Sequence, residues 1–264
     1  MSGYLFEERG NVFVPTELTR GGWSDEAQHG SPPSGLLARA VEAVPTAVEM
    51  QTVRFTIDLF RPVPLTPLTV RTEVRRDGLR IQVVDTYLCA GDVEVGRASA
   101  LKIRVGTFDL ELPDETGEVM PPLDRAEPMS IEDAFGRSRL PRFHTHAVEI
   151  RTVDGSFFRP GMGESWFRLK VQVVAGEEPS PFVRLATLAD MSNGNSQNLH
   201  PRRWIYVNPD ITLYASRLPE GEWIGMRSIA HQHPSGIGLA DTQVFDQRGP
   251  LGRINQAQLI EPRS

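Results

Sequence analysis

The stretch RLATLADMSNGNSQNL, residues 184–199, changes from apolar to polar in the middle of an expected helix. Apolar residues at helical spacing are followed by the carboxylate of Asp190 and a run of amides and hydroxyls. Such a carboxylate can cap a helix end, because Asp and Asn bind local backbone groups. It can also serve as a catalytic base when it is partly buried. Asn193 and Asn195 are more typical of groups that bind local backbone.

The histidines form patterns that could hold a metal or contact a substrate. His144 and His146 are two residues apart in an expected strand, and two residues on one strand face could share a zinc ion. Neither cysteines nor a helical pair of histidines accompany them, so we predict no metal site. His29 and Gly30 lie in the turn QHGSPPSG, ahead of an expected helix. Free N–H groups at a helix start can receive an anion or a thioester oxygen, which makes both residues candidates for substrate binding.

Composition narrows the class of protein. The 264 residues carry a net charge of −6, which argues against a nucleic-acid-binding surface. No apolar run approaches the roughly 20 residues of a membrane span, and MSGYLFEERG lacks the pattern of a signal peptide. Cys89 is the single cysteine, so no intramolecular disulfide is expected. These features favour a cytoplasmic protein, and nothing in the sequence indicates a cofactor.

The chain repeats itself. An ungapped shift of 156 residues lays 54–104 on 210–260 and gives eight identities, where residue frequencies predict roughly three. The hydrophobic alternation of VRFTIDLF keeps its parity in DITLYA after the shift, which is typical of half-buried antiparallel strands. The identical pairs are Thr56/Thr212, Arg61/Arg217, Arg71/Arg227, Ile81/Ile237, Asp85/Asp241, Thr86/Thr242, Gly96/Gly252 and Arg97/Arg253.

Each half is predicted to contain one helix and an antiparallel sheet in the order β–α–β–β–β–β. The helices are expected in SGLLARAVEA and in the stretch around Asp190, with their apolar faces toward the sheet. FHTHAVEIRTV is expected to be the first strand of the second half. The fold class is therefore α+β. We predict an N-terminal domain over 1–108, an acidic and proline-rich linker over 109–142 and a C-terminal domain over 143–264.

The two halves differ at positions that could do chemistry. Under the 156-residue shift, Asp190 corresponds to Ser34, Asn208 to Thr52 and Gln256 to Ala100. The second half therefore has a carboxylate and a carboxamide that the first half lacks. This asymmetry favours one active site per chain, built mainly by the second half.

A sheet wrapped around one helix and duplicated in tandem resembles the double hotdog fold. QHGSPPSGLLARAVEA, LATLADMSNGNS, NPDITLYASR and GLADTQVFDQRGPLGRINQAQLI resemble the thioesterase-like family related to bacterial acyl-CoA thioesterase II. The resemblance implies that an Asp, a Thr and a Gln activate a water that attacks the thioester directly. Carried onto this sequence, these catalytic residues are Asp190 and Gln256, with Asn208 at the position of the Thr.

The resemblance implies hydrolysis of a fatty acyl-CoA to free acid and CoA, with Asp190 as general base and Gln256 and Asn208 placing the water. Two alternatives stay open: a hydratase or dehydratase of enoyl or hydroxyacyl thioesters, for which His200 lies just beyond the helix segment, and a non-catalytic acyl-thioester-binding module. Asp210 is a further candidate base, although an ion pair is more typical. The helices are expected to line the acyl channel, and exposed edge strands predict at least a homodimer.

Overall fold

The computed structural model describes residues 3–22, 24–111, 119–129, 140–156, 159–200 and 203–263. The helical segments are η1 (Glu17–Thr19), α1 (Ser31–Glu42), η2 (Leu123–Arg125), η3 (Phe143–Ala147), α3 (Pro181–Leu188), η4 (Ala189–Met191) and α4 (Ser192–Asn195). The strands are β1 (Tyr4–Arg9), β2 (Val12–Pro15), β3 (Met50–Leu59), β4 (Thr69–Asp77), β5 (Ile81–Ala90), β6 (Val93–Arg104), β7 (Glu127–Met129), β8 (Val148–Ser156), β9 (Arg159–Leu169), β10 (Gln172–Val174), β11 (Trp204–Val207), β12 (Asp210–Ala215), β13 (Trp223–His233), β14 (Ile237–Asp246) and β15 (Gly249–Pro262).

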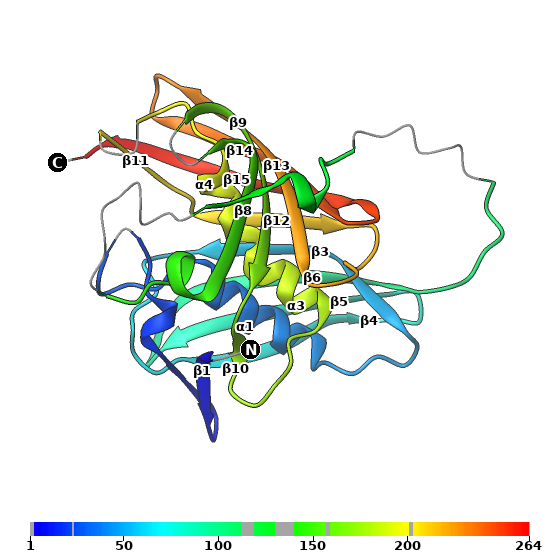
Figure 1. Ribbon diagram of the computed structural model, residues 1–264. Coiled ribbons are helices and arrows are strands. Elements are labelled where there is room, and N and C mark those ends of the chain that lie inside the picture. The colour runs from blue at the N-terminus through cyan, green and yellow to red at the C-terminus, as the bar shows by residue number, and fades with distance from the viewer. Residues whose placement is uncertain are drawn as a thin grey trace.

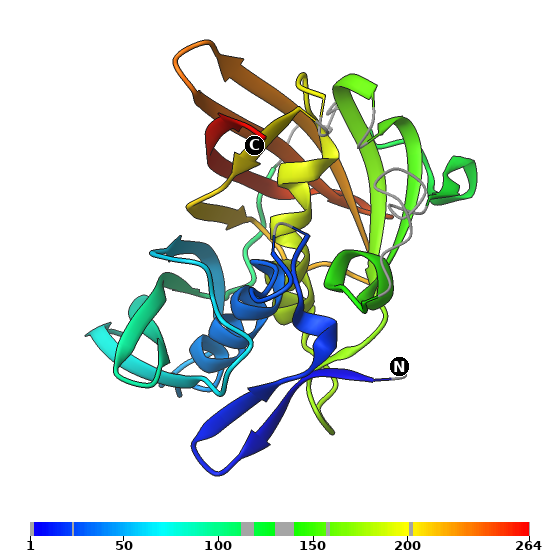
Figure 2. The same cartoon turned by 90° about the vertical axis from the view of Figure 1, so that its left-hand side faces the viewer.

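One large sheet joins the two halves through their first repeated strands. It runs β4-β5-β6-β3-β12-β15-β14-β13-β9-β8-β7, with β11 also paired to β15. The order β4-β5-β6-β3 is mirrored by β12-β15-β14-β13, so the predicted double hotdog fold is confirmed. Figures 1 and 2 show the two halves of the sheet around a central pair of helices, α1 in blue and α3 in yellow-green.

The strand register reproduces the 156-residue shift. Where β3 meets β12, Thr56 lies opposite Thr212, which are equivalent residues of the two repeats. Within the halves, Val84 pairs with Ala100 just as Ala240 pairs with Gln256. A pseudo-two-fold axis therefore passes between β3 and β12. The ungapped repeat places equivalent residues at equivalent positions on the two sides of this axis.

Helices α1 and α3 pack against each other in opposite directions. Ser34 Oγ donates a hydrogen bond to the carbonyl of Ala186. A side chain on Gly35 would collide with Thr187 Oγ1, so this glycine permits the close approach. The start of α1 thus lies beside the end of α3, and the end of α1 beside the start of α3.

The structure corrects several predicted elements. Residues Phe143–Ala147 form a π-helical turn, so the strand predicted from 143 begins only at Val148 and His144 and His146 do not share a strand face. The hairpin β1–β2 lies outside the large sheet and pairs with β10 in a separate three-stranded sheet. Strand β7 falls within the predicted linker and pairs with β8.

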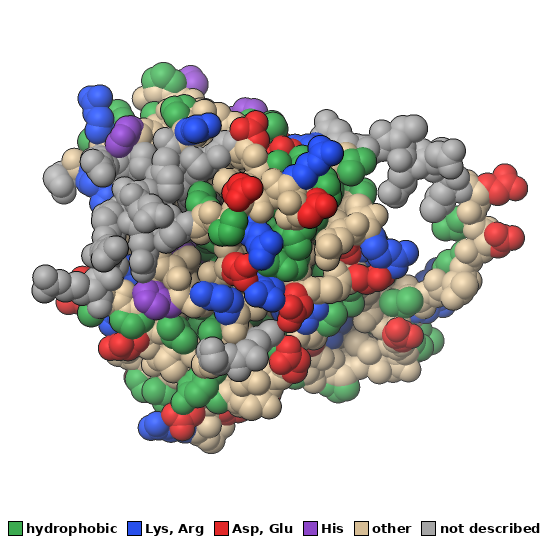
Figure 3. Space-filling view, viewed as in Figure 1, with side chains coloured by type: hydrophobic (Ala, Val, Ile, Leu, Met, Phe, Trp, Pro, Cys, Tyr) green, Lys and Arg blue, Asp and Glu red, His purple; other side chains and the backbone are tan. Residues whose placement is uncertain are grey.

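The surface gives two further observations. On the face shown in Figure 3, acidic and basic side chains lie intermixed. On β8 and β9, Glu149 pairs with Arg151 and Arg168. Among the described residues, none of the helices combines the length and apolar character needed to cross a bilayer. The predicted homodimer stays a prediction.

Candidate functional site

Asp190 lies where the helix of the second half is interrupted. Helix α3 ends at Leu188, the tight turn η4 carries Asp190, and the short helix α4 follows from Ser192. The carboxylate does not cap its own helix, as one sequence interpretation allowed. It lies instead against the N-terminus of α1, in the other half of the chain, where the backbone N–H of Gly30 donates to it.

Three groups hold the Asp190 carboxylate. His29 Nδ1 lies 2.7 Å from Oδ2, and Asn208 Nδ2 donates to Oδ1 at 2.7 Å. A Cβ at Gly30 would lie only 2.8 Å from Oδ2, so the absence of a side chain there allows the contact with the Gly30 backbone. The structure therefore brings together four of the predicted site residues, His29, Gly30, Asp190 and Asn208.

The pKa of Asp190 lies below its ordinary value. Burial acts in the opposite direction and would raise the pKa, since the residue is only 6% exposed. The electrostatic interaction with His29 lowers the pKa, as do the hydrogen bonds from His29, Asn208 and the Gly30 N–H. Together these contacts stabilise the charged form and outweigh burial. Asp190 is therefore ionised at neutral pH, and a proton on His29 Nδ1 accounts for the short contact between them.

The side chain of Asn208 is held by a chain of hydrogen-bonded amides. It lies between β11 and β12, at the point that matches the bulge in β3 between Thr52 and Arg54. Its Oδ1 accepts a hydrogen bond from Asn193 Nδ2, and Asn193 Oδ1 accepts one from Gln258 Nε2. This chain of amides reaches from the sheet to Asp190 and orients the Asn208 amide so that it donates to the carboxylate.

The structure corrects the expected role of the amides after Asp190. Asn193 and Asn195 do not bind local backbone. Asn195 Nδ2 donates to the carbonyls of Gly163 and Met226 on β9 and β13, and Asn193 also binds the carbonyl of Tyr206. The two residues therefore join α4 to the sheet through side-chain hydrogen bonds. The sequence signal for this role was the run of amide side chains that follows an apolar helix.

Gln256 binds the turn that carries Asp190, but no hydrogen bond joins it to the Asp190 carboxylate among the described residues. Its Nε2 donates to the carbonyl of Ala189 and to Ser192 Oγ, and it is fully buried. Its Oε1 has no hydrogen-bond partner among the described residues. A buried, unpaired carbonyl oxygen beside a candidate site is unusual and fits a group that receives a hydrogen bond from a bound water or substrate.

The start of α1 offers one spare backbone donor. Pro32 and Pro33 have no N–H, and the N–H of Ser34 already binds the carbonyl of Gly30. The N–H of Ser31 donates a hydrogen bond of 3.2 Å to His29 Nδ1, and it loses this acceptor when Nδ1 carries the proton that binds Asp190. Ser31, which the sequence analysis did not single out, thus places a donor at the positive end of α1. Its buried Oγ has no partner among the described residues.

Of the other sequence candidates, His144 packs its ring on His29, with the ring centroids 5.9 Å apart, and the rest lie apart from this cluster. Asp210 accepts a hydrogen bond from the N–H of Ala257. His146 is exposed. Within the described ranges, no group of three or more His, Cys, Asp or Glu side chains is arranged to hold a metal ion. The predicted acyl channel between the helices is not open at the described contact, because α1 and α3 touch at Gly35 and Thr187.

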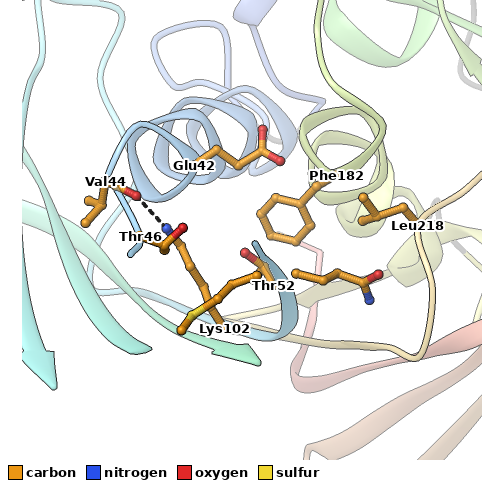
Figure 4. A pocket seen from close by; sticks show the side chains of 9 residues that line it. Glu42, Val44, Thr46, Thr52, Lys102, Phe182 and Leu218 are labelled. Carbon is orange, nitrogen blue, oxygen red and sulfur yellow. Dashed lines mark hydrogen bonds between the residues drawn. The ribbon is translucent and has the colours of Figure 1, made fainter. Parts of the chain in front are cut away.

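A pocket lies at the opposite ends of the same helices (Figure 4). It is a cavity of about 150 Å³ lined by Glu42, Val44, Thr46, Met50, Gln51, Thr52, Lys102, Phe182 and Leu218. Glu42, at the end of α1, accepts a hydrogen bond from Ser180 Oγ at the start of α3. Thr52 and Lys102 occupy the strand positions of Asn208 and Gln258 in the other half. The first half therefore has a carboxylate after all, although Ser34 does not supply it.

Known structures with the same fold cover nearly the whole chain. A hotdog-fold protein of unknown function from Alicyclobacillus acidocaldarius is 16% identical, with a TM-score of 0.73 over 98% of this chain and 96% of its own. An acyl-CoA thioesterase II from Mycobacterium marinum is 15% identical, with a TM-score of 0.66 over 98% and 94%. A search of curated proteins gives no match.

Sequence profiles of the family match both halves. The profile of the acyl-CoA thioesterase N-terminal domain matches residues 19–103, and that of the C-terminal domain matches residues 120–260, which is more than half of the chain. Each half carries one side of the Asp190 cluster, His29 and Gly30 in the first match and Asp190, Asn208 and Gln256 in the second. The chain belongs to the acyl-CoA thioesterase family.

Proposed function

We propose that the protein hydrolyses a fatty acyl-CoA, or a related acyl thioester, to the free acid and CoA at the Asp190 cluster. The observation that carries the proposal is the ionised Asp190 carboxylate, held by His29, Asn208 and the start of α1. A fixed buried carboxylate can organise a water for direct attack on the thioester carbonyl. No acyl-enzyme is then required.

The oxyanion that forms in this reaction needs a hydrogen-bond donor. The N–H of Ser31 supports the proposal, because it loses its acceptor when His29 Nδ1 binds Asp190 and the helix dipole favours negative charge at the start of α1. In this reaction the water oxygen bonds to the carbonyl carbon, and the carbon–sulfur bond breaks to release CoA. The proposal assigns the hydrogen bond from that water to Gln256 Oε1, which is buried and has no partner among the described residues.

A release assay tests the proposal. Free CoA thiol is measured with short-, medium- and long-chain acyl-CoAs for the wild type and for Asp190→Asn. We expect turnover with at least one chain length and a loss of about 100-fold or more in kcat/KM for the variant, the usual contribution of an acid–base group. Glu42→Gln is the matched control, because it neutralises the carboxylate at the other ends of the same helices, and its kcat/KM should equal that of the wild type.

The same assay separates the alternatives. An Asp–His pair also suits the addition of water to an enoyl thioester, and the contact between Asp190 and His29 is the observation that favours this second candidate. Loss of enoyl-CoA absorbance without thiol release would establish the hydratase and overturn our proposal. Saturable acyl-CoA binding with neither reaction would establish a binding module instead.

A further inference from the structure

We infer that His29 Nε2, and not Asp190, takes the proton from the attacking water. This inference rests on the proposed hydrolysis and assigns its general base. His29 and Asp190 come from different halves of the chain, and their contact at 2.7 Å joins the halves at the site. Asp190 then serves as the positioning residue for the imidazole.

The carboxylate is poorly suited to act as the base. Asn208 donates to Oδ1, while His29 Nδ1 and the Gly30 N–H complete its shell. These donors stabilise the charged form, so the carboxylate has little tendency to take up a proton from water.

The imidazole has the opposite properties. With the proton on Nδ1 directed at Asp190, the lone pair of Nε2 is free, and Nε2 makes no hydrogen bond with the described residues. The His29 side chain is 18% exposed, three times the value for Asp190, so it is the member of the pair that a substrate can reach. A carboxylate on one ring nitrogen and a free lone pair on the other is the arrangement by which His acts as a base in hydrolases.

Two aromatic rings pack on the imidazole of His29. The rings of Phe143 and His144 pack on His29 with centroids 5.1 and 5.9 Å away. Burial, and then the charges of His29, Arg142 and His146, lower the pKa of His144 to about 3, so His144 is neutral and does not repel an imidazolium. The ionised Asp190 faces that imidazolium across the short contact and stabilises it.

The proton balance closes within the pair and the substrate. His29 Nε2 takes a proton from water while the water oxygen bonds to the carbonyl carbon. The tetrahedral intermediate collapses, the carbon–sulfur bond breaks, and the imidazolium returns its proton to the departing CoA sulfur. The products are the carboxylic acid and the CoA thiol, and His29 is neutral again.

His29→Gln tests the inference, because Gln can still donate to Asp190 but cannot take up a proton. We expect kcat/KM to fall by about 100-fold or more. In His29→Ala, added imidazole should restore part of the activity, which a merely structural role for His29 would not allow. His233→Gln, at an exposed hairpin, is the matched control and should keep wild-type activity.

Two results would overturn the inference. One is a His29→Gln variant that keeps wild-type kcat/KM, which would limit His29 to positioning the carboxylate. The other needs no turnover: ¹⁵N shifts of the His29 ring in the wild type should show protonated Nδ1 and unprotonated Nε2 at neutral charge, and the reverse tautomer would refute it. An inactive wild type with the expected tautomer would sink the proposed hydrolysis and leave the Asp190–His29 pairing intact.

Discussion

The two ends of the α1–α3 pair are built alike and hold different chemistry. At one end Asp190, after α3, faces Gly30 at the start of α1; at the other Glu42, in the last turn of α1, faces Ser180 at the start of α3. The pseudo-two-fold axis relates the strand residues behind them, Asn208 to Thr52. The scaffold therefore offers a carboxylate at a helix N-terminus twice, and the neighbours decide what each one does.

The neighbours lower the pKa of both carboxyl groups and burial raises both, but the net shifts are opposite. Glu42 is largely exposed as a residue, but desolvation of its carboxyl group raises its pKa and outweighs the effects of Ser180 and Lys102. Asp190 has three donors, and they lower its pKa in spite of burial. The comparison teaches that burial alone does not make a site. A stable charge requires donors that the fold holds in place before any substrate arrives.

The largest effect that separates the two ends should come from Asn208. In Asn208→Val the donor to Asp190 Oδ1 is lost, and we expect kcat/KM to fall by about 100-fold, as for other preorganised donors. Asn208→Thr installs the residue found at Thr52, and its hydroxyl can still donate, so it should keep kcat/KM within about 10-fold of the wild type. Steady-state kinetics of both variants give the comparison, and equal losses would show that the donor is not what matters.

The next effect tests the glycine that faces Asp190. Gly30 has a φ of −64°, so alanine is free of backbone strain there, but its Cβ would lie 2.8 Å from Asp190 Oδ2. We expect Gly30→Ala to displace the carboxylate and lower kcat by about 10- to 100-fold while the melting temperature is kept. A variant with wild-type kcat would contradict the need for this close approach.

Ser180→Ala is the matched control at the other helix start. Ser180 Oγ caps α3 through the N–H of Val183, so the variant should lose about 1 kcal/mol of stability. It should keep kcat, because Ser180 contacts Glu42 and not Asp190. Gly30→Ala would then lower kcat and keep stability, while Ser180→Ala would lower stability and keep kcat.

The repeated strands of the two halves were predictable because the repeat carries no gap. Period-2 alternation placed the repeated strands, and in the structure the 156-residue shift relates the pairing of Gln256 with Ala240 to that of Ala100 with Val84. The helices do not keep that shift. α1 begins at Ser31 and α3 at Pro181, 150 residues later, so the predicted match of Asp190 with Ser34 did not locate the first half's carboxylate.

The partners of Asp190 were harder to predict, because contacts between distant segments leave no local pattern. His29 was expected to bind substrate, and nothing in QHGSPPSG shows that its ring contacts a residue of the other half. Asn193 was expected to bind local backbone, but its amide reaches Asn208 across the core. The start of α3 was readable, since Ser180 followed by Pro181 is a common helix start.

The smallest effect concerns Lys102, which lies at the strand position of Gln258 in the other half. Its ammonium donates to the carbonyl of Val44 and is only 4% exposed, and burial lowers its pKa despite the nearby Glu42. Holding this charge in the pocket costs stability at neutral pH. We expect Lys102→Met to raise the free energy of unfolding by about 1 kcal/mol, as for other buried charges replaced by apolar side chains, with kcat/KM unchanged.

The pH dependence of that gain tests its cause. Between the lowered pKa of folded Lys102 and the unfolded value of about 10.4, the unfolded chain binds more protons, so the wild type gains stability as the pH rises. Lys102→Met lacks this term, and its advantage should shrink over the same window. Urea denaturation from neutral to alkaline pH measures it, with Glu42→Gln added in both backgrounds to remove the uncompensated carboxylate. A constant advantage would mean that better packing, and not relief of a buried charge, stabilises the variant.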